Sequence, residues 1–250
     1  MSPASFRAQV EYVTRRGWRG VGCGELEAFL AGEPLPAKSF LITFDDGYLD
    51  NYVHAYPVLR EFCQRATIFV VTGWIGEGPA RAASGDAAAA PDCPDHRRCK
   101  EAIRTGAADE VMLRWSEIER MRAEGVCEFH SHTHQHRRWD REIADETERR
   151  QHLGGDLAQS RDTLQRRLGV DSSHLCWPQG YFDDAYLEAA RAAGFTHCYT
   201  TDKSVNRPGS DPLRIGRIVA KEASPSWLER RLSWFSSPLL GGLYTRWRGH

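Results

Sequence analysis

Two carboxylates stand side by side in the segment Thr43-Phe44-Asp45-Asp46-Gly47, directly after a short apolar run. Successive side chains of an extended chain point in opposite directions, so Asp45 and Asp46 cannot face the same partner. This favours a division of roles, in which one carboxylate binds a metal ion and the other binds a proton. The alternative is a turn, in which the second Asp caps the next helix.

A histidine-rich segment, HSHTHQH at residues 130–136, follows a second apolar run. His132 and His136 are four positions apart, which places both imidazoles on one side if the chain turns helically there. Neutral imidazole is the commonest protein ligand for zinc. The alternatives are a solvated histidine-rich loop and a metal-binding tract without chemistry. One carboxylate with two imidazoles leaves a coordination position open, as a catalytic zinc site requires.

Short apolar runs alternate with longer helical patterns, which indicates an α/β fold with a parallel sheet or barrel. Runs rich in β-branched and aromatic residues predict strands buried on both faces. These runs cover residues 40–44, 66–71, 126–129, 174–177, 197–200 and 215–219. Both polar segments described above follow a predicted strand, at the end where barrel and open-sheet enzymes assemble their sites.

Helical patterns lie between the predicted strands. Ser116 and Glu119 form a capping box that predicts a helix start, and Gly125 predicts the end of that helix. Further helices are predicted over residues 51–63, 141–168 and 183–193. Gly154-Gly155 predicts a break or kink in the longest of them. Residues 76–109, with an Ala-Gly-Ser-Pro tract, are predicted to form a partly disordered surface insertion.

The composition is that of a globular protein, with 250 residues, 41% hydrophobic and 27% charged. The 33 basic and 34 acidic side chains give a net charge of -1, so we expect no nucleic-acid partner. Seven cysteines are an odd number and predict reduced thiols. The chain shows neither an apolar stretch of about 20 residues, the length that spans a bilayer, nor a signal peptide. We therefore expect a cytoplasmic protein, or one peripheral at the inner membrane face.

Three motifs resemble those of the polysaccharide deacetylases with a NodB-homology domain. Residues 43–52 (TFDDGYLDNY) resemble the first motif, residues 132–136 match the family's His-Ser/Thr-x-x-His, and residues 176–180 (CWPQG) resemble the third, Pro-x-Gly motif. The resemblance extends over nearly the whole chain and implies a deacetylase domain over residues 1–222. Its implied fold is a distorted (β/α) barrel with about seven strands or fewer.

The resemblance also implies the roles of the two polar segments. Asp46, His132 and His136 would ligate a divalent metal ion, Zn²⁺ in the first place and Co²⁺ or Ni²⁺ as alternatives. Asp45 would be the base that takes a proton from water. The expected reaction is attack of metal-activated water on the amide carbonyl of an N-acyl sugar.

The third motif implies an oxyanion site at the backbone N–H of Gln179, with Gly180 allowing close approach of the backbone. Two departures from the family pattern accompany it. Cys176 and Trp177 occupy the region where the family has an Arg that helps to position the base. A Leu-His pair near the carboxyl end, which supplies the general acid in much of the family, is missing.

No residue is therefore assigned as the general acid. His134, His197 and His130 are candidates, although a packing or metal-supporting position is the favoured interpretation of each. Arg217 belongs to an Arg-Ile pair. We interpret it as an internal partner of a site carboxylate, with a plain structural salt bridge as an equal alternative.

The expected activity is hydrolysis of N-acetyl or other N-acyl groups from amino sugars of a polysaccharide or glycoconjugate, on carbon-nitrogen bonds of linear amides. The alternatives are deformylation or deacetylation of a lipid-linked sugar, and a non-catalytic carbohydrate-binding relative. Asp45 argues against the binding relative, because a binding protein needs no base beside the metal. A phosphatase is disfavoured, since Asp-Asp-Gly lacks the Asp-x-Asp spacing.

The carboxyl-terminal tail, residues 223–250, is aromatic and basic. Residues 226–250 suit a helix lying in a membrane interface, which would fit a glycolipid substrate. The favoured alternative is that the tail packs over the flank of the barrel or mediates dimerisation. The oligomeric state is not predicted.

Overall fold

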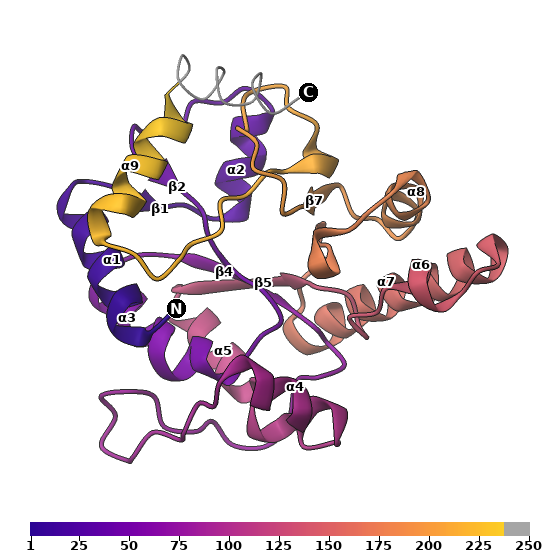
Figure 1. Ribbon diagram of the computed structural model, residues 1–250, viewed down its shortest axis with the longest axis horizontal. Helices are drawn as coiled ribbons and strands as arrows, with labels where there is room; N and C mark the ends of the chain where they lie inside the picture. Colours follow the sequence, from indigo (N-terminus) through magenta and orange to yellow (C-terminus); the bar gives the residue numbers. More distant parts are fainter. Residues whose placement is uncertain (238–250) are drawn as a thin grey trace.

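A five-stranded parallel sheet in the order β3-β4-β5-β6-β7 forms the centre of the computed structural model, which describes residues 1–237 (Figure 1). Its strands are β3 (Ile42–Phe44), β4 (Ala66–Val70), β5 (Cys127–Ser131), β6 (His174–Cys176) and β7 (His197–Tyr199). A separate parallel pair consists of β1 (Arg19–Gly20) and β2 (Ser39–Phe40). The curled, open sheet with helices around it confirms the predicted distorted (β/α) barrel of about seven strands or fewer.

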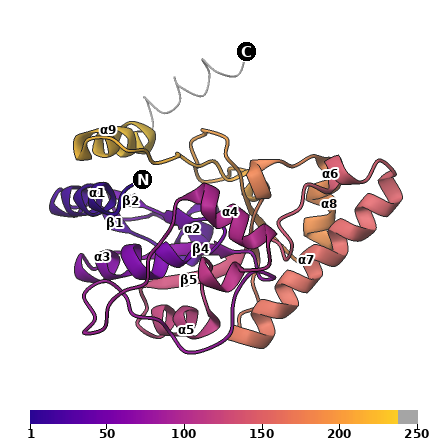
Figure 2. The same ribbon diagram turned by 60° about the horizontal axis from the view of Figure 1, so that its bottom comes forward.

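The helices surround this sheet (Figures 1 and 2). They are α1 (Pro3–Arg15), α2 (Cys23–Leu30), α3 (Tyr56–Glu61), α4 (His96–Arg104), α5 (Trp115–Ala123), α6 (Trp139–Glu142), α7 (Glu146–Leu168), α8 (Asp184–Ala192) and α9 (Pro225–Ser236). One π-helical turn, Asn51–Ala55, precedes α3, so the helix predicted over 51–63 has two parts.

The two faces of the central strands carry different residues. Ile68 of β4 and Phe129 of β5 pack with Ile118 of α5 in the largest apolar cluster. Strand side chains alternate, so the residues one position along point to the interior of the half-barrel. There Phe69 of β4 packs against Tyr199 of β7, with 4.6 Å between their ring centroids. The half-barrel therefore has an interior of its own, which is partly polar.

The strand predicted over 215–219 is wrong, because Ile215 makes only an isolated bridge with Tyr199. Beyond it the Asn206 side chain bonds both the N–H and the C=O of Gly216, each at 3.0 Å. These side-chain hydrogen bonds take the place of the backbone hydrogen bonds that a sixth strand would make with its neighbour. The strand predicted over 40–44 is divided at Leu41 between β2 and β3.

Two helix predictions are also wrong. Helix α7 continues through Gly154-Gly155 for 23 residues, and the interruption lies earlier, before its cap at Asp145. Burial of Leu157 and Leu164 along α7 outweighs the cost of glycine in a helix, about 1 kcal/mol each. The capping box at Ser116 does not form.

Helix α5 begins at Trp115 instead. The Arg114 N–H donates to Glu117 Oε2 at 2.9 Å, while the Ser116 hydroxyl donates to the Gly78 carbonyl oxygen at 2.8 Å. The acidic residue that accepts a backbone N–H at the start of α5 is therefore Glu117, two positions before the predicted Glu119.

The 76–109 segment is tied to the barrel by one buried ion pair. The Arg81 guanidinium donates to both carboxylate oxygens of Glu117, at 2.7 and 2.8 Å. Its remaining N–H groups donate to the carbonyl oxygens of Asp109 and Met112. Part of the segment forms helix α4.

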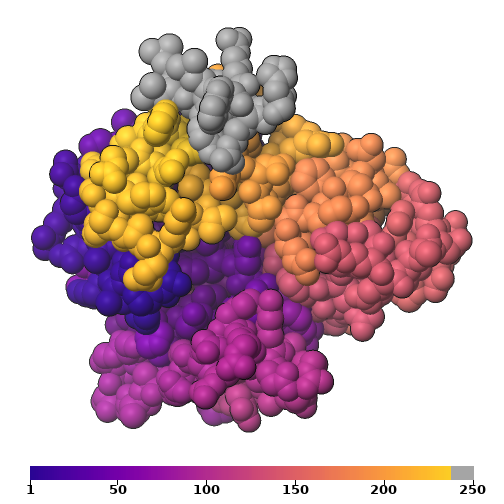
Figure 3. All heavy atoms as spheres, in the orientation of Figure 1, coloured from indigo at the N-terminus to yellow at the C-terminus, as the bar shows by residue number. Residues whose placement is uncertain are grey.

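Helix α9 lies along α1 on one flank of the molecule, where Figure 3 shows the two in contact. Gln9 of α1 donates to the carbonyl oxygens of Lys221 and Ala223, which lead into α9. The rest of the predicted tail, 238–250, lies outside the described residues. No helix in the described part is long and apolar enough to cross a bilayer. All seven cysteines are free thiols, as predicted.

Candidate active site

The polar segments singled out from the sequence meet at the carboxyl ends of the strands. Asp45 and Asp46 follow β3, His132 follows β5, and Cys176 is the last residue of β6. In a parallel sheet these ends lie on one edge, because all strands run in the same direction. The structure therefore brings together residues that are up to 131 positions apart in the chain.

Asp46, His132 and His136 converge on one point. Asp46 Oδ1 lies 3.2 Å from His132 Nε2 and 3.3 Å from His136 Nε2. This buried oxygen accepts no hydrogen bond of acceptable geometry from the described residues. A buried carboxylate oxygen without a donor is costly, and a cation among the three atoms would satisfy it. The donor set, one oxygen and two nitrogens, fits a divalent transition metal ion.

The backbone at these positions is strained. Asp46, Thr133 and His136 have φ values of 71°, 67° and 56°, in the left-handed region that non-glycine residues seldom adopt. The segment 132–136 does not turn helically but forms a loop, so the two imidazoles meet for a different reason than helical spacing. Thr133 turns the chain sharply after β5, and its Oγ1 accepts the His136 N–H at 2.9 Å. Such strain persists where surrounding contacts hold it, often at functional sites.

Asp156 of α7, which was not predicted from the sequence, holds this histidine loop. Its Oδ1 accepts the N–H groups of His134 and Gln135 at 2.8 and 2.9 Å, and its Oδ2 accepts Trp139 Nε1 at 3.0 Å. Burial raises the pKa of Asp156, and these three hydrogen bonds offset only part of that effect. An acid on the buried face of α7, one position before Leu157, was the available signal.

The tautomer of His132 is set by a contact with β6. His132 Nδ1 lies 2.7 Å from the backbone carbonyl oxygen of Cys176, which can only accept. The proton therefore resides on Nδ1, and Nε2 faces Asp46 and His136. A backbone carbonyl behind a ligating imidazole is the usual support of a metal site.

Asp45 has a different partner from Asp46. Arg217 Nη1 and Nη2 donate to the two Asp45 carboxylate oxygens at 2.7 and 2.9 Å. Burial opposes ionisation of Asp45, but the Arg217 hydrogen bonds and the nearby charges outweigh it, and the pKa lies below its ordinary value. Arg217 Nη2 also lies 3.1 Å from Cys176 Sγ. The arginine missing from the third motif is thus replaced by one from another part of the chain.

The charge states of Asp46 and His136 suit metal ligands. Burial disfavours ionised Asp46, yet the close contact with His132 and the charges of His132 and His136 lower its pKa to about 2. Burial lowers the pKa of His136 to about 4, with the His132 charge acting in the same direction. At neutral pH Asp46 is therefore a carboxylate and His136 a neutral imidazole.

The third motif forms a short 3₁₀ turn, Pro178–Gly180, directly after β6 and Trp177. Gln179 and Gly180 both have positive φ values, 58° and 70°. A Cβ on Gly180 would lie 2.1 Å from Thr201 Oγ1, so a side chain cannot be placed there without a shift. Glycine is thus required by the packing of this turn against Thr201.

The structure does not place His134 or His197 beside the three converging residues Asp46, His132 and His136. His134 Nδ1 lies 2.9 Å from Thr72 Oγ1, beside Gly73. His197 lies in the barrel interior, stacked on His174 with 4.7 Å between ring centroids. Within the described residues, neither histidine makes a hydrogen bond, ion pair or ring contact with Asp46 or His132. The role of general acid stays without an assigned residue.

Comparisons with known proteins agree with the geometry. A family profile described as polysaccharide deacetylase matches residues 32–198. The chain is 25% identical over 198 residues to the putative polysaccharide deacetylase YxkH of Bacillus subtilis, covering 79% of this chain and 57% of that relative. It thus spans just over half the length of YxkH. It is 21% identical over 237 residues to the poly-β-1,6-N-acetyl-D-glucosamine N-deacetylase of Staphylococcus aureus, covering 94% of this chain and 72% of that protein.

Solved structures show the same fold. IcaB from Ammonifex degensii superposes with a TM-score of 0.72 and 27% identity, covering 95% of this chain and 90% of that one. The Streptococcus pyogenes deacetylase PplD, in complex with acetate, also gives a TM-score of 0.72, at 22% identity over 92% of this chain and 86% of that one. The resemblance noted from the motifs is confirmed. Because the profile spans more than half of the residues, including both polar segments, the chain belongs to the polysaccharide deacetylase family.

Proposed function

We propose that this protein is a metal-dependent N-deacetylase that hydrolyses the acetamido group of amino sugars in a polysaccharide. One observation carries the proposal: three potential ligands converge on a point, while Asp45, adjacent in sequence, is held apart by Arg217. A metal-binding site without chemistry has no need of this second, ionised carboxylate.

Asp46, His132 and His136 are the residues that would hold the metal. A divalent ion bound there lowers the pKa of water and polarises the substrate carbonyl. The His132 bond to the Cys176 carbonyl and the Asp156 bonds to the histidine loop set the directions of the two imidazoles. The chain's contribution is therefore a set of ligands held in place before the ion arrives.

Asp45 is the proposed base. It is half-buried beside Asp46 and kept ionised by Arg217, so it can take a proton from water at neutral pH. The bidentate contact uses both carboxylate oxygens and limits rotation of the side chain. Arg217 is a positioning residue, because it acts through Asp45.

The oxyanion that forms from the amide carbonyl would be met by the backbone N–H of Gln179. The left-handed conformation of Gln179 and the contact of Gly180 with Thr201 fix the direction of this turn. A fixed backbone donor needs no rearrangement as negative charge develops.

The relatives and one aromatic side chain support a proposal for the substrate class. The Staphylococcus aureus relative is named for poly-β-1,6-N-acetyl-D-glucosamine. In this chain the Trp74 ring lies beside His136, with 5.1 Å between centroids, so an indole borders the proposed metal. Indole rings pack well against the apolar faces of sugars, whose edges stay hydrated. We therefore propose a β-1,6-linked N-acetylglucosamine polymer as substrate.

The test is acetate release from defined oligomers. The purified chain is stripped of metal, reloaded with Zn²⁺, Co²⁺ or Ni²⁺, and assayed on β-1,6- and β-1,4-linked N-acetylglucosamine oligomers. His132→Ala should abolish both metal retention and acetate release. His134→Gln, which alters a neighbouring histidine outside the converging group, should retain both. Equal activity of His132→Ala and the unaltered chain would contradict the mechanism.

A further inference from the structure

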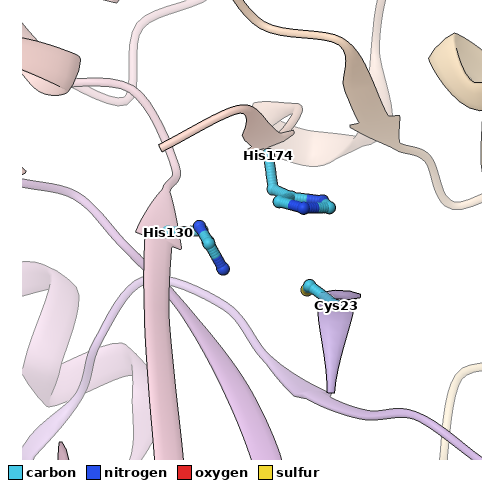
Figure 4. Close-up of side chains that lie close together, drawn as sticks. All are labelled: Cys23, His130 and His174. Carbon is cyan, nitrogen blue, oxygen red and sulfur yellow. The ribbon is translucent and has the colours of Figure 1, made fainter. Parts of the chain in front are cut away.

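A second group of metal-ligating side chains lies inside the half-barrel and is formed by Cys23, His130 and His174 (Figure 4). One ligand atom from each lies within 4.8 Å of the others. The three come from separate elements: Cys23 begins α2, His130 belongs to β5 and His174 begins β6. All three are buried, with 1%, 9% and 4% of their surfaces exposed.

This cluster lies one layer below the candidate active site. His130 of β5 stands two positions before His132, which follows the strand, and His174 stands two positions before Cys176 on β6. Residues two apart on a strand share a face and are separated by about 6.6 Å. The cluster is therefore deeper in the barrel, on the amino-terminal side of the proposed catalytic ligands, and shares no residue with Asp46, His132 and His136.

We propose that Cys23, His130 and His174 form a buried zinc site with three protein ligands, which ties α2 to strands β5 and β6. A thiolate with two imidazoles is a soft to borderline donor set that suits Zn²⁺ and differs from the O, N, N set of the upper site. This inference does not depend on the proposed deacetylase activity.

Neighbouring groups already orient the donors. His130 Nδ1 lies 2.9 Å from Ser172 Oγ, which leaves Nε2 as the ligand atom. The Tyr199 hydroxyl lies 3.2 Å from both Cys23 Sγ and His174 Nδ1, so these two atoms face the same small region. Hydrogen-bonded partners of this kind are what ligating side chains need in order to keep their direction.

The far side of His174 is also supported. His174 Nε2 lies 3.7 Å from Glu27 Oε2, so a carboxylate stands behind the imidazole whose Nδ1 faces Cys23. Carboxylate, imidazole and metal in a row is a recurrent arrangement in zinc proteins. Glu27 and His197 offer a second ligand set that shares His174, but the Glu27 side chain is half exposed. The enclosed set that contains Cys23 is therefore the one we propose.

The charges balance within the barrel. Zinc binding displaces the thiol proton of Cys23 to solvent, which leaves one negative charge on sulfur. The Glu128 carboxylate supplies a second negative charge next to Cys23. Its Oε1 accepts hydrogen bonds from Thr67 Oγ1, at 2.6 Å, and from the Cys23 backbone N–H. A divalent cation beside one thiolate and one carboxylate is electrically neutral as a group, which a buried site requires.

Cobalt spectroscopy of the full chain tests the proposal without any substitution. The chain is stripped with a chelator and titrated with Co²⁺ while the near-ultraviolet spectrum is recorded. A thiolate-to-cobalt charge-transfer band should appear, because the barrel site has a sulfur ligand and the Asp46, His132, His136 site has none. Reconstitution with Zn²⁺ should give two ions per chain by elemental analysis. One ion per chain with no thiolate band would overturn the proposal.

Substitutions then assign the band. Cys23→Ser should remove the band and one zinc ion and leave acetate release unchanged. Cys127→Ser is the matched control, because Cys127 is equally buried on β5 but belongs to the outer apolar cluster, and it should keep both. His132→Ala should lose the other ion and keep the band.

Cys176→Ser tests whether the sulfur ligand is Cys176 instead of Cys23, because Cys176 lies near His132 in the candidate active site. It should keep the band. A band that survives Cys23→Ser, or one that disappears with Cys176→Ser, would place the sulfur elsewhere and refute the proposal.

Discussion

The guanidinium of Arg217 donates hydrogen bonds to both carboxylate oxygens of Asp45, although 172 positions separate the two residues. A bidentate arginine holds a carboxylate more rigidly than a single hydrogen bond does. It also favours ionised Asp45 against the effect of burial. The family's usual arginine is absent before Pro178, and this contact supplies the same support from a different part of the chain.

Removing the Arg217 guanidinium should impair the base while leaving metal binding intact. We expect Arg217→Met to lower kcat/KM by about 100-fold, the effect of a misplaced catalytic group. Without the guanidinium, burial raises the pKa of Asp45 toward and above its ordinary value of about 3.9. Activity requires the ionised carboxylate, so the acid limb of the pH profile should move to higher pH. Arg217→Lys keeps the positive charge but cannot make the bidentate contact. Its kcat/KM should therefore lie between the values of Arg217→Met and of the unaltered chain.

The check is a kcat/KM pH profile recorded together with the metal content of each variant. An acid limb that stays in place in Arg217→Met would show that Arg217 does not act through Asp45.

Asp156 should control metal affinity although it lies outside the converging ligands. Asp156→Ala removes the acceptor of the His134 and Gln135 N–H groups, and we expect about 10- to 100-fold weaker zinc binding. Asp156→Asn keeps an acceptor oxygen and should lose less zinc affinity than Asp156→Ala. Asp162→Ala, an exposed acid on the same helix, serves as control. Competition with a chromophoric chelator measures the affinities, and equal values for the two alanine variants would contradict this role.

The turn after β6 should respond oppositely to two neighbouring substitutions. Gly180→Ala forces a Cβ into Thr201 at a positive φ, and we expect a loss of about 1–3 kcal/mol in the free energy of unfolding, with reduced kcat. Gln179→Gly relieves a left-handed non-glycine residue and keeps the backbone N–H, so activity should stay within a few-fold. Thermal unfolding and acetate release distinguish the two. Strong loss of activity in Gln179→Gly would assign the role to the side chain.

The pair formed by Arg81 and Glu117 should be the main anchor of the 76–109 segment. Glu117 is fully buried and Arg81 nearly so, with 0% and 14% of their side chains exposed. Glu117→Gln leaves a buried guanidinium without its counter-charge, and we expect a loss of about 3–5 kcal/mol in the free energy of unfolding. Urea titration measures this loss, with exposed Glu119→Gln on the same helix as control. Similar values for both variants would show that the pair contributes little.

The sequence alone was enough to predict the family, the converging residues and the main strands. Asp45, Asp46, His132 and His136 follow apolar runs that become β3 and β5, because alternating or continuous apolar patterns are a local property of the chain. The resemblance to the deacetylase motifs rests on the same short segments. Family, fold class and the converging residues could therefore be predicted before the structure.

Tertiary structure decided the rest, since it depends on contacts between distant positions. The predicted break at Gly154-Gly155 failed because packing of α7 outweighs glycine's weak helix propensity. The loop after the left-handed Thr133 is held by Asp156 of α7, which lies 21 to 22 positions away along the chain, so no local pattern reveals this contact.

The partners of Asp45 and of Cys23 show the same limit most clearly. Arg217 meets Asp45, and His130 and His174 meet Cys23, only once the parallel sheet has curled and brought these elements around a common interior. A sequence lists the residue types that can ionise or bind a metal. Which of them face each other is determined by the register and curvature of the strands that carry them.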